Sequence, residues 1–238
     1  MRIHCVSDLH GNLPEVPECD LLLIAGDYWG YGYCFGSEKS QAKWLRHHLQ
    51  PWLHDLRSEN RVQEIVGIAG NHDGIFERKY ADPGSEIPEL EWTYLENSGV
   101  MVNIGGQEIR VHGIPWTPWF HDWAFNLPRE DTRDEVLMRN MLKAVPEDTD
   151  ILISHGPPFE VLDMTNDYRN VGSHALREMI EKQKPALVVC GHIHEARGVK
   201  QHRDTLVVNA SIVGPLGHQK TGDGFTLEGD SLRALTLL

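Results

Sequence analysis

The chain has 238 residues and a mass of 27.0 kDa, with 40% hydrophobic and 24% charged residues. This length suffices for one sizeable core, and no segment approaches the roughly 18 continuous apolar residues of a membrane-spanning helix. The formal net charge is −13 and the basic residues are scattered, which opposes a long nucleic-acid partner. We expect one domain over residues 1–238 and no membrane partner. The N-terminus shows no signal-peptide pattern and the four cysteines show no C-x-x-C spacing, which favours the cytoplasm.

Apolar runs typical of β-strands start near the N-terminus and recur along the chain. We predict strands at 2–8, 20–27, 64–73, 100–106, 107–115, 150–156, 186–194 and 205–211, with further extended structure in the tail 224–238. The neighbouring runs 100–106 and 107–115 meet at Gly105-Gly106, which predicts an antiparallel hairpin.

Helical periodicity is found in three segments. The predicted helices are 38–57, 133–144 and about 173–183. Pro51 is expected to kink or break the first helix, and Pro185 lies just after the third. A capping-box pattern from Thr132 to Glu135 opens the second helix. With no repeat or linker in the chain, these elements predict an α/β domain with central sheets and flanking helices.

The predicted buried strands share one feature, because five of them end in side chains that commonly bind metal ions. These are Asp8 and His10, then Asp27, then Asn71 with His72 and Asp73, then His155, and finally His192 with His194. In open α/β sheets the loops beyond the carboxyl ends of the strands form the binding crevice, so neighbouring strands would bring these groups together. Adjacent glycines permit sharp turns and close approach of the backbone.

His192 and His194 illustrate the geometry, because alternate side chains of an extended segment point to the same side. Taken singly, an Asp after a strand is commonly a cap or turn residue, and a buried His is commonly a hydrogen-bonded core residue. Burying the whole set without partners would be costly, so we interpret it as a metal site. Imidazole with carboxylate suits Mn, Fe, Zn or Ni ions, and the sequence does not choose among them.

The motifs D-L-H, G-D, G-N-H-D, H-G and G-H-I-H follow one another between Asp8 and His194. Together they resemble the signature of the calcineurin-like metallophosphoesterase superfamily. The segments GIPWTPWF, FNLPR, TDILISHGPP and GHIHEARG are similar to its metallophosphoesterase-domain-containing subfamily, which is related to class III cyclic nucleotide phosphodiesterases. The resemblance implies a four-layer α-β-β-α sandwich with mixed sheets, formed by a single metallophosphoesterase domain over residues 1–238. Some members of the subfamily have glycine at the position of His192, so its presence here favours full activity.

The resemblance also implies a dinuclear metal centre and assigns its ligands. One ion would be held by Asp8, His10, Asp27 and His194. The other would be held by Asp27, Asn71, His155 and His192. Asp27 would link the two ions, because a carboxylate has two oxygens and such ions lie about 3.5 to 4 Å apart. Two transition-metal ions would acidify a bridging water, and the resulting hydroxide would attack phosphorus.

His72 follows Asn71 directly, so its ring is expected to point away from the metal ions toward the leaving group. We predict His72 as a general acid, or as a donor to the transition-state oxyanion, with Asp73 as the partner that orients it. A helix cap is the alternative role for Asp73.

The segment GIPWTPWFHDWAFN concentrates aromatic residues between two prolines and has no clean period, which predicts a loop. Trp116, Trp119, Phe120 and Arg129 are candidate substrate contacts, because aromatic faces can stack on a nucleobase. The alternative is a local core that fixes the loop to the domain. The segment YWGYGYCFG at 28–36, directly after Asp27, is a candidate for another wall of the site.

These features favour hydrolysis of a phosphodiester, with a cyclic nucleotide as the small phosphate-ester substrate. A phosphomonoesterase or a dinucleoside polyphosphate hydrolase is the alternative, and a catalytically silent metal-binding scaffold is the alternative of another class. The segment GDYWG lacks the GDxVDRG pattern of protein serine/threonine phosphatases. Tyr28 follows Asp27 by one residue rather than three, which opposes the tyrosine ligand of purple acid phosphatases.

Overall fold

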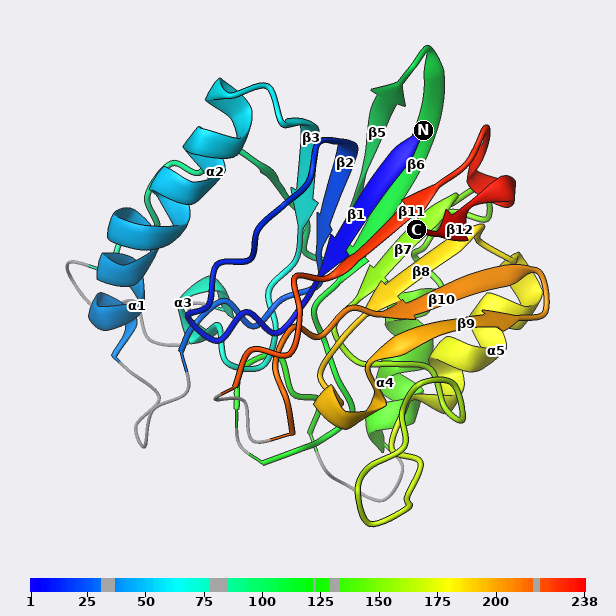
Figure 1. Ribbon diagram of the computed structural model, residues 1–238. Helices are drawn as coiled ribbons and strands as arrows, with labels where there is room; N and C mark the ends of the chain where they lie inside the picture. The colour runs from blue at the N-terminus through cyan, green and yellow to red at the C-terminus, as the bar shows by residue number, and fades with distance from the viewer. Residues whose placement is uncertain (31–36, 78–84, 122, 129–132, 216–218) are drawn as a thin grey trace.

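In the computed structural model, two six-stranded β-sheets pack face to face and helices cover the outer face of each sheet (Figure 1). The structure describes residues 1–30, 37–77, 85–121, 123–128, 133–215 and 219–238. The order of layers is therefore helices, sheet, sheet, helices. This arrangement confirms the predicted α-β-β-α sandwich with mixed sheets.

The first sheet has the strand order β12-β11-β1-β2-β3-β4. Its strands are β1 (Arg2–Val6), β2 (Cys19–Ile24), β3 (Val62–Gly67), β4 (Thr93–Tyr94), β11 (Phe225–Glu228) and β12 (Thr236–Leu237). Strands β1 to β4 run parallel, whereas β11 is antiparallel to both β1 and β12. The two-residue strand β4 was not predicted, because a segment this short carries no measurable periodicity.

The second sheet has the strand order β5-β6-β7-β8-β10-β9. Its strands are β5 (Ser98–Ile104), β6 (Gln107–Ile114), β7 (Ile151–Ser154), β8 (Leu187–Cys190), β9 (Gly198–His202) and β10 (Thr205–Asn209). Strands β6, β7, β8 and β10 run parallel, and β9 pairs antiparallel with β10. The pairing of β5 with β6 confirms the predicted hairpin.

Helices α1 (Glu38–Trp44), α2 (Gln50–Ser58) and α3 (Gly74–Glu77) lie on the first sheet. Helices α4 (Arg133–Leu142) and α5 (His174–Gln183) lie on the second sheet. Short helical turns are η1 (Leu45–Leu49), η2 (His194–Ala196) and η3 (Leu232–Ala234). Within the described ranges, no helix has the length and apolar character needed to cross a membrane.

Alternation along the parallel strands builds the layers. In β2, Leu21 and Leu23 lie in the core between the two sheets, whereas Leu22 and Ile24 pack under α1 and α2. Strands β7 and β8 divide their side chains in the same way between the inter-sheet core and α4 with α5. Because both faces of these strands are buried, they appear in the sequence as continuous apolar runs.

The helix predicted at 38–57 passes Pro51 without ending. Helix α1 continues into the π-helical turn η1, and α2 follows it directly. The backbone N–H of Gln50 donates to the carbonyl of Leu45, five residues earlier, just before Pro51. The wider turn lets the helix accommodate a residue that has no N–H to donate. The expected interruption is thus a local change of helix type, and the predicted break is wrong.

Glu135 caps a neighbouring helix. Its carboxylate accepts hydrogen bonds from the backbone N–H groups of His174 (3.2 Å) and Ala175 (2.7 Å) at the start of α5. The Ser173 side chain also caps α5, because it accepts from the N–H of Leu176. Thr132, the other half of the predicted capping box, lies outside the described residues. The negative charge of Glu135 is therefore placed where the dipole of α5 favours it.

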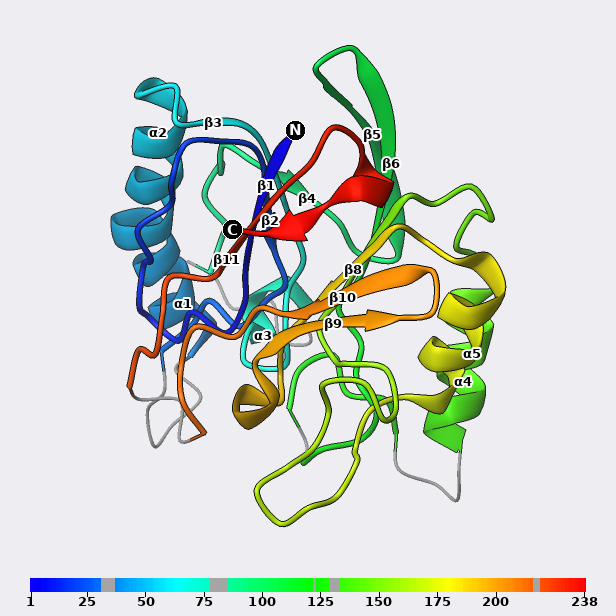
Figure 2. The same cartoon turned by 45° about the vertical axis from the view of Figure 1, so that its right-hand side comes forward.

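The two sheets are joined where β1 and β10 end. The N–H of Ser7 donates to the carbonyl of Ala210 (2.9 Å), and the N–H of Ile212 donates to the carbonyl of Ser7 (3.0 Å). The loops that follow the parallel strands of both sheets gather at this end of the molecule, below the sheets in Figure 2. Side chains from both sheets can therefore meet here.

Candidate metal centre and cleft

The structure brings the seven side chains predicted as metal ligands to the ends of five parallel strands. They are Asp8 and His10 after β1, Asp27 after β2, Asn71 after β3, His155 after β7, and His192 and His194 after β8. We call these seven residues the strand-end cluster. Two groups of three within it have all their ligand atoms within 4.8 Å of one another: Asp8, His10 and His194, and Asp8, Asp27 and His155. Residues 186 positions apart in the chain, such as Asp8 and His194, are thus neighbours in space.

The first group forms around Asp8. The Nε2 atom of His194 lies 3.2 Å from Oδ1 of Asp8 and 3.3 Å from Nε2 of His10. The Nε2 atom of His10 in turn lies 3.7 Å from Oδ2 of Asp27. The four residues assigned to the first ion are therefore linked through adjacent ligand atoms.

The second group forms around His155. Its Nε2 atom lies 2.8 Å from Oδ1 of Asn71 and 3.4 Å from Oδ2 of Asp27. The His192 ring lies beside the His155 ring, with 5.1 Å between the centroids. Oδ2 of Asp27 thus lies between the two groups, whereas Oδ1 accepts a hydrogen bond from the backbone N–H of His72 (2.8 Å). Oδ2 is therefore the oxygen of Asp27 that faces both groups.

The hydrogen bonds of three imidazoles show which ring nitrogen carries the hydrogen and which is free to bind a cation. The Nδ1 atoms of His10, His155 and His194 lie 3.2, 2.7 and 3.1 Å from the backbone carbonyls of Trp29, Ala25 and Gly214. A carbonyl only accepts, so each Nδ1 carries the hydrogen and Nε2 of the neutral ring presents a lone pair. The facing Nε2 atoms of His10 and His194 would repel without a proton or cation between them. This donor set fits a metal ion.

The backbone is held in an unfavourable conformation at four members of the strand-end cluster. Asp8 (φ 53°), His10 (φ 42°), Asp27 (φ 58°) and His192 (φ 66°) all adopt the left-handed region. Such conformations cost on the order of 1–3 kcal/mol each for non-glycine residues, and they gather at functional sites. These turns place the four side chains at the junction of the two sheets.

Two glycines allow the cluster to close. A Cβ atom on Gly70 would overlap Oδ1 of Asp27 and the ring of His155. A Cβ atom on Gly191 would overlap the Ser7 hydroxyl and the Asp8 carboxylate. Both positions confirm the close backbone approach expected from the glycines beside the predicted ligands.

The two buried carboxylates of the cluster are ionised. Burial acts to raise the pKa of Asp8, but the charge and hydrogen bond of His194, aided by His155, lower this pKa to about 2. Burial also opposes ionisation of Asp27, and the charges of His155 and His72 hold its pKa well below the usual range. The cluster therefore concentrates negative charge in a water-poor place, which favours the binding of cations.

The imidazoles divide into two kinds. Burial lowers the pKa of His10 to about 4 and that of His192 to about 3. Burial acts in the same direction on His155, but the charge of Asp27 and its hydrogen bond raise this pKa to about 9. For His194, burial is outweighed by Asp8, which raises the pKa. The neighbouring carboxylates thus raise the pKa of His155 and His194, whereas burial lowers the pKa of His10 and His192.

His72 lies beside the cluster and faces the cleft. Its Nε2 atom lies 4.0 Å from Oδ2 of Asp27, and its ring centroid lies 4.8 Å from that of His10 and 4.6 Å from that of Trp123. His10, Asp27 and His72 form a further group whose ligand atoms lie within 4.8 Å of one another. Burial lowers the pKa of His72, although the charge of Asp27 opposes this shift.

Asp73 has neither of the roles predicted for it. Its carboxylate accepts hydrogen bonds from the backbone N–H groups of Asp27, Tyr28, Trp29 and Gly70. At the start of α3, the N–H of Ile75 instead donates to the side chain of Gln41 (3.0 Å). Burial and the charge of Asp27 raise the pKa of Asp73 to about 7, against the backbone hydrogen bonds from Gly70 and Trp29. The carboxylate thus contacts the backbone of the loops after β2 and β3, whereas the carbonyl of Asp73 accepts from the N–H of Phe76 in α3 (3.0 Å).

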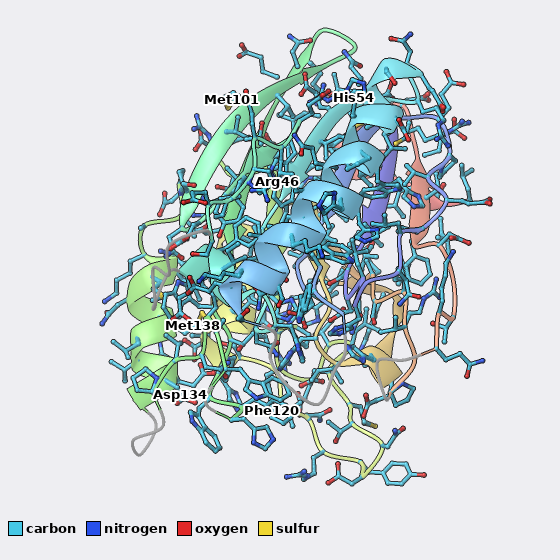
Figure 3. All side chains as sticks on the ribbon, turned by 90° about the vertical axis from the view of Figure 1, so that its left-hand side faces the viewer. Arg46, His54, Met101, Phe120, Asp134 and Met138 are labelled. Carbon is cyan, nitrogen blue, oxygen red and sulfur yellow. The ribbon has the colours of Figure 1, made fainter. Side chains whose placement is uncertain are left out.

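A cleft of about 440 Å³ opens over the cluster. Its lining includes Asp27, Asn71, His72, His192 and His194, together with Trp119, Phe120, Trp123, Thr165, Arg169 and Val171. We call Trp119, Phe120, Trp123 and Arg169 the rim. The Phe120 side chain is 46% exposed, and its ring lies 5.7 Å from that of His192 and 5.4 Å from that of Trp123. Figure 3 shows Phe120 at the end of the molecule opposite to Met101 and His54.

The aromatic loop divides into a rim part and a core part. Trp119 and Phe120 line the cleft, whereas Trp116 is half-buried, lies outside the cleft lining and packs against Phe125 with 5.4 Å between ring centroids. Arg129 lies outside the described residues, as do residues 31–36 of the predicted wall at 28–36. Tyr28 of that segment is fully buried, and its hydroxyl donates to the carbonyl of Ile68.

Thr165 and Arg169 were not predicted as site residues. They lie in the irregular segment between β7 and α5, where no hydrophobic period or motif marks them. Arg169 places a positive charge in the cleft lining, and its Nε atom pairs with Asp167 at 2.6 Å.

The fold and the site together define a class of protein: a two-sheet α/β sandwich that presents carboxylates, an amide and imidazoles where the sheets meet. The model of the family described as Calcineurin-like phosphoesterase matches residues 1–196. The chain therefore belongs to the calcineurin-like phosphoesterase family, as its motifs predict.

Individual relatives agree with this assignment. Human Metallophosphoesterase domain-containing protein 1 is 33% identical over 236 residues, a match that covers 89% of this chain and 66% of the relative. Probable rhamnogalacturonate lyase C of Emericella nidulans is 34% identical over 203 residues, covering 83% of this chain and 17% of the relative. The chain thus spans between 17% and 66% of the length of these curated relatives. The first relative confirms the predicted subfamily.

A solved structure supports the fold. The crystal structure of the protein TT1561 of Thermus thermophilus superposes with a TM-score of 0.60 at 18% sequence identity. The match covers 100% of this chain and 97% of the other. At this identity, the likeness supports the architecture alone.

Proposed function

We propose that the protein hydrolyses nucleotide phosphodiesters, with cyclic nucleotides as the first substrates to test, at two bound transition-metal ions. One observation carries the proposal. Oδ2 of Asp27 lies 3.7 Å from Nε2 of His10 and 3.4 Å from Nε2 of His155, at the floor of a cleft. A single carboxylate oxygen between two sets of imidazole lone pairs is suited to a pair of cations.

The strand-end cluster supplies enough donors for both ions. Asp8, His10, Asp27 and His194 would hold one ion, and Asp27, Asn71, His155 and His192 the other. Mn, Fe, Zn and Ni all accept such mixed oxygen and nitrogen ligands. When bound, two such ions supply an acidified water as nucleophile and positive charge beside the phosphate.

His72 would act on the leaving group. The backbone N–H of His72 is fixed by Oδ1 of Asp27, and the ring lines the cleft against Trp123. Burial lowers the pKa of His72, and a phosphate dianion or monoanion bound in the cleft would raise it again. Substrate binding would thus load the proton that His72 donates to the departing oxygen.

The rim would bind the nucleoside part of the substrate. Trp119, Phe120 and Trp123 line the cleft, and stacking on one base contributes about 1–3 kcal/mol in single-strand binders. The guanidinium of Arg169 would add positive charge for a second anionic group.

We also propose the cytoplasm as the compartment. Cys5, Cys19 and Cys190 are free thiols that are buried in the hydrophobic core. Cys34 lies outside the described residues. Free buried thiols are typical of proteins in a reducing environment.

The decisive experiment is a screen of metal-reconstituted protein against aryl phosphodiesters, aryl phosphomonoesters, cyclic nucleotides and dinucleoside polyphosphates. Asp27→Ala serves as the blank, because it removes the central oxygen of the cluster. We expect the metal-reconstituted wild-type protein to hydrolyse diesters and cyclic nucleotides, and Asp27→Ala to hydrolyse neither. Preference for monoesters or polyphosphates would replace the proposed substrate class. Bound metal without hydrolysis of any ester would identify a silent metal-binding scaffold.

A further inference from the structure

The loops that follow β2 and β3 exchange hydrogen bonds between carboxylate and backbone. The N–H of Asp27 donates to Oδ2 of Asp73 (2.8 Å). In return, the N–H of His72 donates to Oδ1 of Asp27 (2.8 Å). Each loop thus sends one carboxylate to the backbone of the other. The pair fixes the position of the first loop relative to the second.

Backbone N–H groups occupy all acceptor sites of the Asp73 carboxylate. Oδ2 also accepts from the N–H of Gly70 (2.8 Å), and Oδ1 accepts from the N–H groups of Tyr28 (2.9 Å) and Trp29 (3.2 Å). The side chain is 1% exposed. Four N–H donors occupy the acceptor sites of a carboxylate, and such charge-assisted bonds are short and strong. Asp73 therefore has no lone pair left for a metal ion or for a substrate.

The contact fixes a turn that the backbone would otherwise avoid. Asp27 adopts a left-handed conformation with φ 58°, directly after Gly26 with φ 95°. Three successive N–H groups, from Asp27 to Trp29, converge on Asp73 and hold this turn closed. The turn directs Oδ2 of Asp27 toward the imidazoles of His10 and His155.

We propose that Asp73 is a positioning residue for the metal pair. It holds Asp27 in the left-handed turn, so that one oxygen of Asp27 faces both metal positions while the other orients the backbone of His72. The inference rests on the proposed function, because it requires two bound ions. In this role Asp73 orients the carboxylate of Asp27 by binding its backbone, and does not orient the His72 ring.

Asp73→Asn tests the role, because an amide presents N–H groups to two of the four backbone donors. Changes to residues that orient metal ligands typically lower metal affinity about 10- to 100-fold. We expect a loss of this size for the weaker of two Mn²⁺ ions, measured by equilibrium dialysis. The electron paramagnetic resonance signal of the coupled Mn²⁺ pair should be lost with it.

Asp163→Asn is the matched control. Asp163 is equally buried at 1% exposure, and its Oδ2 accepts from the backbone N–H groups of Glu160 (3.0 Å) and Gly172 (2.9 Å). The same chemical change is made here at a buried carboxylate that accepts backbone hydrogen bonds, without touching the Asp27 turn. We expect unchanged Mn²⁺ affinity for both ions in this variant, even where thermal unfolding shows reduced stability.

Two outcomes would overturn the inference: wild-type Mn²⁺ affinity in Asp73→Asn, or equal loss of affinity in both variants. If Asp73→Asn does not fold, Asp73→Glu replaces it, since it keeps the charge and shifts both oxygens by one methylene. Wild-type affinity in Asp73→Glu would also overturn the inference. A wild-type protein that binds two Mn²⁺ ions but hydrolyses no ester refutes the proposed function and leaves this metal comparison valid.

Discussion

The strand-end cluster and the rim face the same cleft but are supported differently. Asp8 and His155 are fully buried at the ends of central strands, and the backbone around them is held by hydrogen bonds. Phe120 is 46% exposed on an irregular loop, and Arg169 lies on another. Under the proposed function, the chemistry would depend on buried strand ends, whereas selectivity would depend on surface loops that can change without loss of the fold. Substitutions in the two regions should have separable effects.

The largest effect is expected from Gly70→Ala. The added methyl group would overlap Asp27 and His155, so the metal pair cannot assemble. We expect kcat to fall by at least about 10⁴-fold, a loss of several kcal/mol, together with loss of bound Mn²⁺ measured by elemental analysis. Gly74→Ala is the control, since a Cβ there would meet only the Gln41 side chain at 3.8 Å. Normal metal content in Gly70→Ala would show that the backbone does not constrain the cluster.

His72→Ala should separate metal binding from turnover. His72 contacts the cluster but is not assigned as a ligand, so both Mn²⁺ ions should remain bound. Loss of a general acid typically lowers the rate by about 10² to 10⁴. Metal content and kcat measured on one preparation would check this expectation. Parallel loss of both quantities would place His72 among the ligands.

Phe120→Ala should act on substrate binding alone. Removal of one stacking ring costs about 1–3 kcal/mol, so KM for a cyclic nucleotide should rise about 5- to 150-fold with little change in kcat. Tyr168→Ala is the control, because Tyr168 is 86% exposed and lies outside the cleft lining. Steady-state kinetics of both variants would test the contrast. Equal KM values would remove the rim from the substrate site.

The smallest effect is expected from Glu91→Gln, which removes a partner of His54 on α2, outside the strand-end cluster and the rim. The exposed His54 ring hydrogen-bonds Glu91 at 2.6 Å, and this bond raises the pKa of His54. Because the pKa is higher in the folded protein, the pair stabilises the fold at low pH, and this contribution disappears as the pH rises through the folded pKa. Glu91→Gln should lower the pKa of His54 in an NMR titration and weaken stability only on the acidic side. A change in metal affinity would contradict the separation of regions.

Much of the fold follows from the pattern of apolar residues. Strand β2 was predictable because Leu21 to Ile24 are buried on alternate faces, which leaves no polar residue in the run. Strand β9 was not predicted, because its edge position leaves Lys200 and Gln201 exposed and its sequence polar. The π-helical turn before Pro51 also has no signal in the sequence, since it depends on how the helix packs on the sheet.

Site residues that directly follow a strand could be predicted from sequence. Residues whose role is set by the direction of a loop side chain could not. Asp8 and Asp27 could be placed side by side from sequence, because the neighbouring parallel strands β1 and β2 bring their carboxyl ends to one edge. His194 follows β8 in the other sheet, so its approach to Asp8 was implied only by the family resemblance. Asp73 could not be assigned, because three of its four backbone partners lie 44 to 46 residues away in another loop. Arg169 could not be predicted either, since an irregular loop carries no period from which to infer its position.

The junction of the two sheets at the ends of β1 and β10 has a consequence for when metal ions could be incorporated. Each proposed ion draws ligands from both sheets, for example Asp8 with His194 across 186 residues of sequence. Neither proposed ion could gain its full set of ligands before residues 192–194 have left the ribosome. Under the proposed function a bound ion would link loops of both sheets, so a chelator should lower the free energy of unfolding of the metal-loaded protein.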